Sequence, residues 1–229
     1  MTEISRSRRY YAKALGIFYV AWAVSFEVVG RYAATLPTSD LTSNWDRAIP
    51  FVSAFVWPYE ACYVLPFVAL FVLKDWHRFN IALVAIAGSN LVAFAVYLAL
   101  PVAFPRPSLG TGLSEQIVAM EYAADFSPGA NKLPSMHVAI SWIIACAMLG
   151  QRGRIADAAT LGTVSAITLS TVFIKQHLVV DAVTGLMLGI GSFVLVRRTY
   201  LRRFGPHVTA EEALARMLRP WRRASVPAR

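Results

Sequence analysis

Long apolar runs restrict the fold of this chain more than any other feature. Six such runs can be marked out, and they cover about residues 14–34, 49–73, 80–104, 134–150, 156–174 and 178–197. A helix needs about 20 residues to cross the hydrocarbon core of a membrane, and most of the runs reach that length. Spanning segments must be helices or strands of a closed barrel, because lipid offers no partner for open backbone groups.

The pattern inside the runs decides between these two options. None of them alternates strictly between apolar and polar residues, as barrel strands would. The sequence therefore predicts an all-α fold, an integral membrane bundle of six transmembrane helices. The low charge content agrees, since only 15% of the residues are charged, against about 25% in a typical soluble domain.

The whole chain, residues 1–229, is interpreted as a single membrane domain. A basic N-terminus (1–12) precedes the six-helix bundle (13–198), and a basic tail (199–229) follows it. In the tail, Thr209 and Glu212 have the spacing of a capping box, which predicts a short amphipathic helix on the membrane surface. A partly disordered tail is the alternative.

The net charge of +9 is distributed in a way that predicts the orientation in the membrane. Basic residues gather at both termini and in the two even-numbered loops, where they are Lys74, Arg78, Arg152 and Arg154. Under the positive-inside rule, both termini are then cytoplasmic and the odd-numbered loops face outward from a multi-pass protein of the cell membrane. No aromatic and basic surface motif accompanies the charge, so a nucleic-acid partner is not expected.

Three polar residues near the outward ends of the runs suggest chemistry. His177 and Asp181 are four residues apart, so on a helix they would share one face. A carboxylate in an apolar run is costly unless it is paired, and it can orient an imidazole so that the other ring nitrogen acts as a nucleophile. A purely structural His–Asp pair at a helix start is the alternative. His137, at the start of the fourth run, supplies a second imidazole.

Several neighbouring residues are suited to holding a phosphate group. Pro134 is typical of a first helical turn, so Ser135 and the residues after it would present backbone N–H groups, and a hydroxyl, to an anion. Arg106 is fixed between two prolines, and its guanidinium suits bidentate phosphate contacts. Lys175, two residues before His177, is a further cation. An interfacial arginine and an ordinary loop lysine are the alternatives.

These residues, in this order, resemble the type-2 phosphatidic acid phosphatase superfamily. The matching positions are Arg106-Pro107, Pro134-Ser135, His137, Ser170, His177 and Asp181, and the departures are Ala99, Met136 and Thr171. The Pro-Ser-Met-His and Lys-Gln-His sequences, with residues 46–51, look like the branch that contains inositol-phosphorylceramide synthases. In that branch Lys175 would replace the arginine missing at Thr171.

The resemblance implies a phosphohistidine mechanism within a six-helix bundle. By position, His177 would be the nucleophile, Asp181 its orienting carboxylate, and His137 the general acid and base. Arg106, Ser135 and Lys175 would bind the phosphoryl oxygens, with no metal and no cofactor.

The predicted function is thus a membrane lipid phosphatase or phosphotransferase that cleaves a lipid phosphoester on the extracytoplasmic side. Its partners are the bilayer and a lipid phosphate substrate. A head-group phosphotransferase of the inositol-phosphorylceramide-synthase type is the first alternative. A bis-histidine haem protein and a non-catalytic transporter with a His–Asp proton relay are alternatives from other classes.

Overall fold

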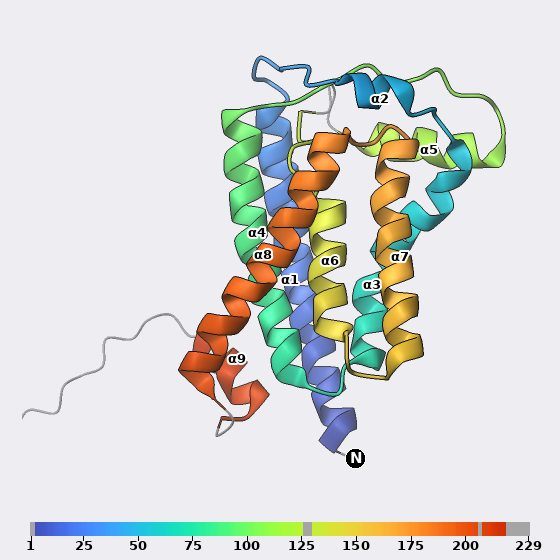
Figure 1. Ribbon diagram of the computed structural model, residues 1–229. Coiled ribbons are helices and arrows are strands. Elements are labelled where there is room, and N and C mark those ends of the chain that lie inside the picture. Colours follow the sequence, from blue (N-terminus) through green and yellow to red (C-terminus); the bar gives the residue numbers. More distant parts are fainter. Residues whose placement is uncertain (1–2, 126–129, 206–207, 219–229) are drawn as a thin grey trace, which may run out of the picture.

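The computed structural model describes residues 3–125, 130–205 and 208–218, and these residues form helices joined by loops (Figure 1). No strand occurs among them, and their β-type pairing is limited to isolated bridges that join Val102 to Ser39 and to Asn131. The elements are α1 (Glu3–Ala33), α2 (Asn44–Ala48), a 3₁₀ turn η1 (Ser53–Phe55), α3 (Val56–Val72), α4 (Trp76–Ala99), α5 (Leu113–Ala124), α6 (Met136–Met148), α7 (Arg154–Phe173), α8 (Val179–Phe204) and α9 (Ala210–Leu218).

Five helices in the described residues are long and apolar enough to cross a membrane. They cover Ser7–Ala33, Ser53–Val72, Trp76–Ala99, Arg154–Phe173 and Val179–Phe204. The remaining apolar run forms α6, which has 13 residues and is about 20 Å long at 1.5 Å per residue. The bundle of apolar helices agrees with the predicted fold class, but α6 is shorter than a hydrocarbon core of about 30 Å.

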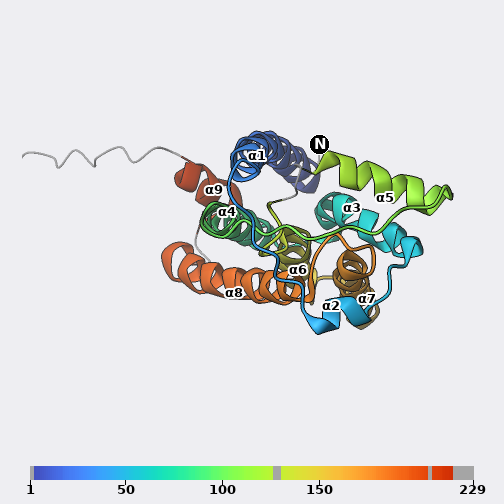
Figure 2. The same ribbon diagram turned by 90° about the horizontal axis from the view of Figure 1, so that it is seen from above.

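Helix α6 lies at the centre of the bundle. Viewed from above, it is surrounded by α3, α4, α7 and α8, while α1 lies outside α4 (Figure 2). Most of its side chains are buried, including Val138, Ala139 and Ile143. A short helix in this position is covered by protein on its sides, which explains how an element below the usual spanning length fits into the bundle.

Two glycines bring α8 into backbone contact with α6. A Cβ at Gly185 would lie 2.4 Å from the carbonyl oxygen of Ser135, and one at Gly189 would lie 2.5 Å from that of Ala139. Real Cβ atoms do not approach a carbonyl so closely, so only glycine permits this spacing. We call the contact the α6–α8 seam.

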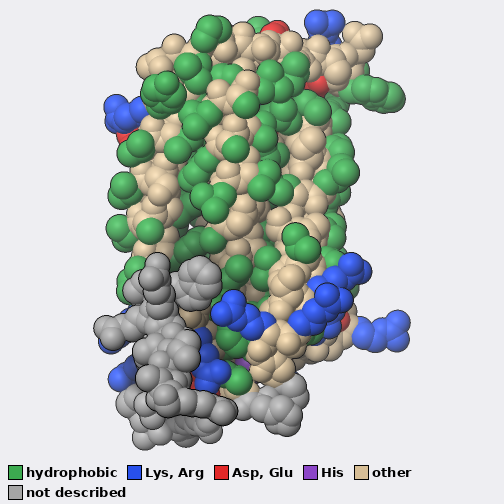
Figure 3. Space-filling model, turned by 90° about the vertical axis from the view of Figure 1, so that its left-hand side faces the viewer, with side chains coloured by type: hydrophobic (Ala, Val, Ile, Leu, Met, Phe, Trp, Pro, Cys, Tyr) green, Lys and Arg blue, Asp and Glu red, His purple; other side chains and the backbone are tan. Residues whose placement is uncertain are grey.

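The two ends of the bundle differ in composition. One end is covered by α2, α5 and the long loops, and the other carries the N-terminus and α9 (Figure 1). A side view shows hydrophobic side chains along the middle of the molecule and Lys and Arg side chains gathered near the end that carries α9 (Figure 3). The predicted orientation in the membrane depends on this gathering of basic side chains at one end of the bundle.

The predicted capping box of the tail is present and opens α9. The Glu212 N–H donates to Thr209 Oγ1 at 3.2 Å, and the Thr209 N–H is 3.4 Å from Glu212 Oε2. The helix packs its buried Ala213 and Leu214 against the bundle. Its Ala210 carbonyl accepts a hydrogen bond from Asn80 of α4. The rest of the predicted tail, residues 219–229, lies outside the described residues.

Candidate active site

His177 lies in the connection between α7 and α8, one residue before the N-cap of α8, Leu178. Its N–H donates to the carbonyl of Thr171 at 2.9 Å. Asp181, in the first turn of α8, accepts the Leu178 N–H on Oδ2 at 2.9 Å, and the same oxygen is 3.4 Å from His177 Nδ1, which is long for a hydrogen bond. The two side chains therefore meet through a helix-start turn, not through a shared helix face as the spacing predicted.

His137 is the second residue of α6, and Ser135 is the N-cap of that helix. Ser135 Oγ accepts from the Val138 N–H at 3.4 Å, and the Ser135 N–H donates to the carbonyl of Asp181 at 2.9 Å. The helix thus begins at Met136, after the position predicted from Pro134. One of the N–H groups expected to be free for an anion instead joins α6 to α8.

The two imidazoles meet at the end of the bundle covered by α2 and α5. His137 Nδ1 is 3.2 Å from His177 Nε2, and the ring centroids are 5.5 Å apart. His177 is buried, with 4% of its surface exposed, and His137 is partly buried. Residues forty positions apart in the chain therefore share one site, as the sequence predicted.

The hydrogen-bond pattern is consistent with one placement of the protons on the two imidazole rings, which is inferred and not observed. If His177 Nδ1 carries its proton toward Asp181, its Nε2 has a free lone pair and accepts from His137 Nδ1. His137 Nε2 is then an acceptor, and the hydroxyl of Tyr59 lies 2.9 Å away to donate to it. Both rings are neutral in this arrangement, and the lone pair of His177 Nε2 points toward His137.

A chain of hydroxyls continues from His137 toward α5. The hydroxyl of Tyr63 lies 3.4 Å from His137 Nε2 and donates to Glu121 Oε2 at 2.9 Å. None of Tyr59, Tyr63 and Glu121 was predicted from the sequence to be a site residue. The two tyrosines are four residues apart on α3, so their shared face was visible in the sequence, but the partner of that face was not.

Arg106 lies at the same end of the bundle as the imidazoles. Its Nη1 donates to the carbonyl of Tyr122 at 2.9 Å, and its guanidinium carbon is 4.1 Å from the centroid of the Tyr122 ring. Its Nη2 forms an ion pair with Asp125. The guanidinium is therefore held in place, as the flanking prolines predicted.

Lys132 is a second cation at this site that the sequence analysis did not single out. It is only 3% exposed, and its Nζ pairs with the same carboxylate oxygen of Asp125 that Arg106 contacts. Gln176, which is 2% exposed, donates to this oxygen from Nε2 at 2.7 Å. A lysine two residues before a Pro-Ser sequence gives no hint of burial, since its partner, Asp125, lies seven residues earlier in the α5–α6 connection, where no helical spacing relates the two.

The local charges shift the pKa values of these groups. Burial raises the pKa of Asp125, but Lys132 and Arg106 outweigh it and hold the pKa below its usual range. Burial also lowers the pKa of Lys132, against the opposing effect of Asp125. Asp125 is therefore a carboxylate at neutral pH, and its negative charge offsets part of the positive charge of Lys132 and Arg106.

Lys175 is engaged by backbone carbonyls near α2. Its Nζ donates to the carbonyls of Asp46 at 2.7 Å and Ile49 at 2.6 Å. In this arrangement it ties the loop around α2 to the connection that carries His177. Burial lowers the pKa of Lys175.

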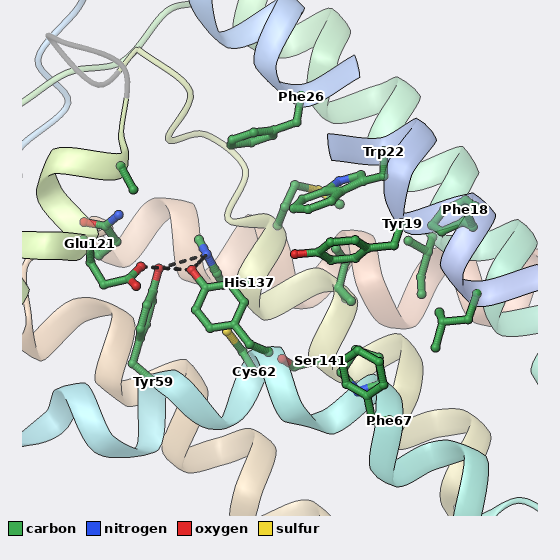
Figure 4. A pocket seen from close by; sticks show the side chains of 18 of the residues that line it. Phe18, Tyr19, Trp22, Phe26, Tyr59, Cys62, Phe67, Glu121, His137 and Ser141 are labelled. Carbon is green, nitrogen blue, oxygen red and sulfur yellow. Dashed lines mark hydrogen bonds between the residues drawn. The ribbon is translucent and has the colours of Figure 1, made fainter. Parts of the chain in front are cut away.

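A cavity of about 190 Å³ lies beside His137. One wall is an aromatic row on α1, and the opposite wall is the face of α3 that carries Tyr59 and Cys62 (Figure 4). Asp125, Gln176 and Glu121 lie at its polar part. The row on α1 consists of Phe18, Tyr19, Trp22 and Phe26. The cavity thus joins apolar walls to the imidazole.

Among the residues that the structure describes, no group of three or more His, Cys, Asp or Glu side chains is placed to hold a metal ion. Cys62 and Cys146 are free thiols.

Comparison with known families agrees with this geometry. Residues 38–195, well over half of the chain, match a family model described as the PAP2 superfamily. The chain belongs to the PAP2 superfamily. Neither curated proteins nor solved structures give a significant match.

Membership of the PAP2 superfamily supports an enzyme that acts, as a phosphatase does, on a phosphoester of a lipid. The matched region contains both imidazoles, Asp181, Arg106 and Lys132. It also contains α2 and α5, the elements that cover the site.

Proposed function

We propose that this protein cleaves a lipid phosphoester through a phosphohistidine intermediate. The observation that carries the proposal is the 3.2 Å contact between His137 Nδ1 and His177 Nε2, next to two buried or clamped cations. Phosphoryl transfer requires mainly positioning and charge stabilisation, and a nucleophile beside a proton donor and cations meets both requirements.

In the first step, the phosphoryl group takes the place of the direct ring-to-ring contact. For this step His137 carries a proton on each ring nitrogen, one more than in the neutral arrangement described above, and it takes up this proton when the anionic substrate binds. The lone pair of His177 Nε2 attacks phosphorus, the bond from phosphorus to the leaving oxygen breaks, and His137 gives that oxygen a proton and becomes neutral. Asp181 stabilises the positive charge that develops on the His177 ring.

In the second step, His137 takes a proton from water while the water oxygen attacks the phosphohistidine. The bond from nitrogen to phosphorus breaks, inorganic phosphate leaves, and His177 regains its lone pair. His137 is protonated again, so the two steps together hydrolyse one phosphoester and return the enzyme to its initial state.

The phosphoryl oxygens are held by Arg106, the Ser135 hydroxyl and Lys132 in this proposal. Lys132 takes the role predicted for Lys175, because Lys175 Nζ is engaged by two carbonyl groups away from the imidazoles. Neither step requires a metal ion, so EDTA should leave activity unchanged. Activity that EDTA abolishes and magnesium restores would contradict this part.

The lipid part of the substrate lies in the cavity between α1 and α3. Its aromatic walls suit an acyl or isoprenoid chain, and His137, which also lines it, is the group that would protonate the leaving oxygen. The proposal includes α6 as a sixth helix within the membrane, both termini in the cytoplasm, and the site at the outward face of the cell membrane. The basic end of the molecule, opposite the site, supports this orientation.

Transfer to an alcohol acceptor, as in inositol-phosphorylceramide synthases, is the second candidate. The Tyr63–Glu121 pair favours it, because an alcohol hydroxyl that hydrogen-bonds to this pair would lie beside His137. An assay with labelled phosphatidic acid, polyprenyl diphosphate and phosphatidylinositol, with and without diacylglycerol or ceramide, separates the two. Free phosphate indicates hydrolysis, and a new labelled lipid indicates transfer.

The mechanism is tested by three substitutions. We expect His177→Ala to lower kcat by about 10⁴-fold or more, because it removes the nucleophile. His137→Ala should lower kcat by about 10²–10⁴-fold through loss of acid–base catalysis, and Asp181→Asn should also lower it strongly. An acid-labile phosphoryl group should be trapped on His177 of the wild type.

The matched control is His77→Ala, which removes a histidine of α4 that hydrogen-bonds to Tyr200. It should retain most of the activity. A His177→Ala variant that still turns over lipid phosphate at near wild-type rates would end the proposal, and so would a phosphoryl group trapped on another residue.

A further inference from the structure

Three buried or clamped donors from different parts of the chain converge on one oxygen atom. Arg106 Nη2, Lys132 Nζ and Gln176 Nε2 all contact Oδ2 of Asp125. Arg106 follows α4, Lys132 precedes α6, and Gln176 precedes α8. A single acceptor oxygen is thus the meeting point of three loops.

We infer that these three donors form the binding site for one phosphoryl oxygen, and that the Asp125 carboxylate occupies this site when no substrate is bound. The inference rests on the proposed function, which it deepens. The carboxylate oxygen stands in for a non-bridging phosphoryl oxygen, since both are anionic and both accept short, charge-assisted hydrogen bonds.

The charges explain why the Asp125 carboxylate occupies the site when no substrate is bound. An ammonium group that is 97% buried, as Lys132 is, would be strongly destabilising without a counter-ion. Asp125 supplies that counter-ion in the free protein. A phosphate group brings its own negative charge, and two anions close together on the same cations repel each other. Substrate and Asp125 therefore compete for the same donors.

The position of the donors fits a group under attack by His177. Gln176 is the residue before His177 in the chain, and Asp125 and Gln176 line the same cavity as His137. A phosphoryl oxygen at this point would keep its phosphorus close to the imidazoles.

A second observation points to a ligand at the same place. Gln176 Oε1 is buried and has no hydrogen-bond partner among the described residues. A buried amide oxygen without a donor is costly, which suggests that a donor arrives with the ligand. A hydroxyl of a protonated phosphoryl group, or of the attacking water or alcohol, would satisfy it.

The inference is tested by the binding of inorganic phosphate to the purified full chain in detergent micelles, measured by calorimetric titration. Asp125→Ala removes the competing carboxylate, so the Kd for phosphate should fall by about tenfold or more. Lys132→Met removes a donor and should raise the Kd by about tenfold or more. The matched control is Glu115→Gln, which removes one negative charge from the first turn of α5, away from the three donors, and it should leave the Kd unchanged.

Asp125→Asn is measured alongside, because it removes the charge but keeps the shape if Asp125→Ala does not fold. Unchanged or weaker phosphate binding in the folded Asp125 variants would overturn the inference, since Asp125 would then only position the cations. Undetectable binding in every variant would also overturn it. Phosphate binding needs no turnover, so tighter binding in a protein that cleaves no lipid phosphoester would refute the proposed function while leaving the anion site in place.

Discussion

The α6–α8 seam and the cavity between α1 and α3 show two opposite ways to join helices in this bundle. At the seam, Gly185 and Gly189 let the two backbones touch, and the Ser135 N–H donates directly to the Asp181 carbonyl. Between α1 and α3, aromatic side chains face each other across about 190 Å³ of space. One contact leaves no room for a methyl group, and the other leaves room for part of a ligand.

The difference separates two requirements of the proposed reaction. The imidazoles must be held to within fractions of an ångström, and the closed seam fixes the helix starts from which His137 and Asp181 project. A lipid chain must enter and leave, and a loosely packed contact with the outermost helix allows this. The most apolar window of α1 has no buried residues, so this helix has little packing to lose when it moves.

Among the tests of this comparison, the largest effect is expected when the seam is opened. In Gly185→Ala, the new Cβ would meet the Ser135 carbonyl at 2.4 Å, so α6 and α8 must separate. We expect kcat to fall by about 10²-fold, the loss typical of a shift of about 1 Å in catalytic groups, together with a loss of stability of about 1–3 kcal/mol. Activity assays and thermal unfolding in detergent measure the two effects.

Gly191→Ala is the matched control, because this glycine is on the same helix and a Cβ there would meet nothing within 4 Å. It should keep full activity and gain slightly in stability through helix propensity. Equal losses of activity and stability in both variants would show that α8 tolerates no added methyl group at either position. The close α6–α8 contact would then not be the reason for the effect of Gly185→Ala.

Sequence reasoning predicted the apolar helices of this fold because apolar runs must become helices in a membrane. It did not predict α2 or α5, which lie between the apolar runs. It also predicted that His137 and His177 meet, since the predicted topology brings their loops to one end. It did not predict the length of α6, because the apolar run includes Pro134 and Ser135, whose backbone lies outside the helix.

The pairing of cations with their partners could not be predicted from local spacing. Lys175 lies two residues before His177 but donates to carbonyls of the α2 loop, whereas Lys132 is buried against Asp125. The first outcome depends on where the distant α2 loop folds, and the second depends on the course of the α5–α6 connection. No periodicity in the sequence predicts either of them. Arg106 was identified because its two prolines restrict it locally.

A smaller effect is expected when the wall of the cavity is altered. Tyr19 lines the cavity from α1 and is more than half exposed, so Tyr19→Ala should cost little stability. It removes apolar contact with a lipid chain worth about 1 kcal/mol, so KM should rise about fivefold for a long-chain lipid phosphate. KM for a water-soluble phosphate ester without a chain should not change. Val20→Ala, which is exposed and does not line the cavity, is the control, and an equal rise in it would argue against this lipid site.

The smallest effect is expected at the start of α8, where Asp46 of α2 accepts the Val179 N–H at 2.7 Å and the Ser43 N–H at 2.8 Å. Burial raises the pKa of Asp46, but these hydrogen bonds and that of the Ser43 hydroxyl outweigh it, so the pKa is lower in the folded protein.

A lowered folded-state pKa means that the charged group stabilises the fold above its unfolded pKa of about 3.9, and that this contribution is lost as the pH falls through the folded value. We therefore expect Asp46→Asn to lose about 0.5–2 kcal/mol at pH 7, seen as a lower Tm in detergent. The difference from wild type should shrink once the pH is below about 4. Asp40→Asn, in the exposed part of the same loop, should change Tm less. A difference in Tm between wild type and Asp46→Asn that stays constant down to the lowest pH would show that the carboxylate charge does not stabilise the start of α8.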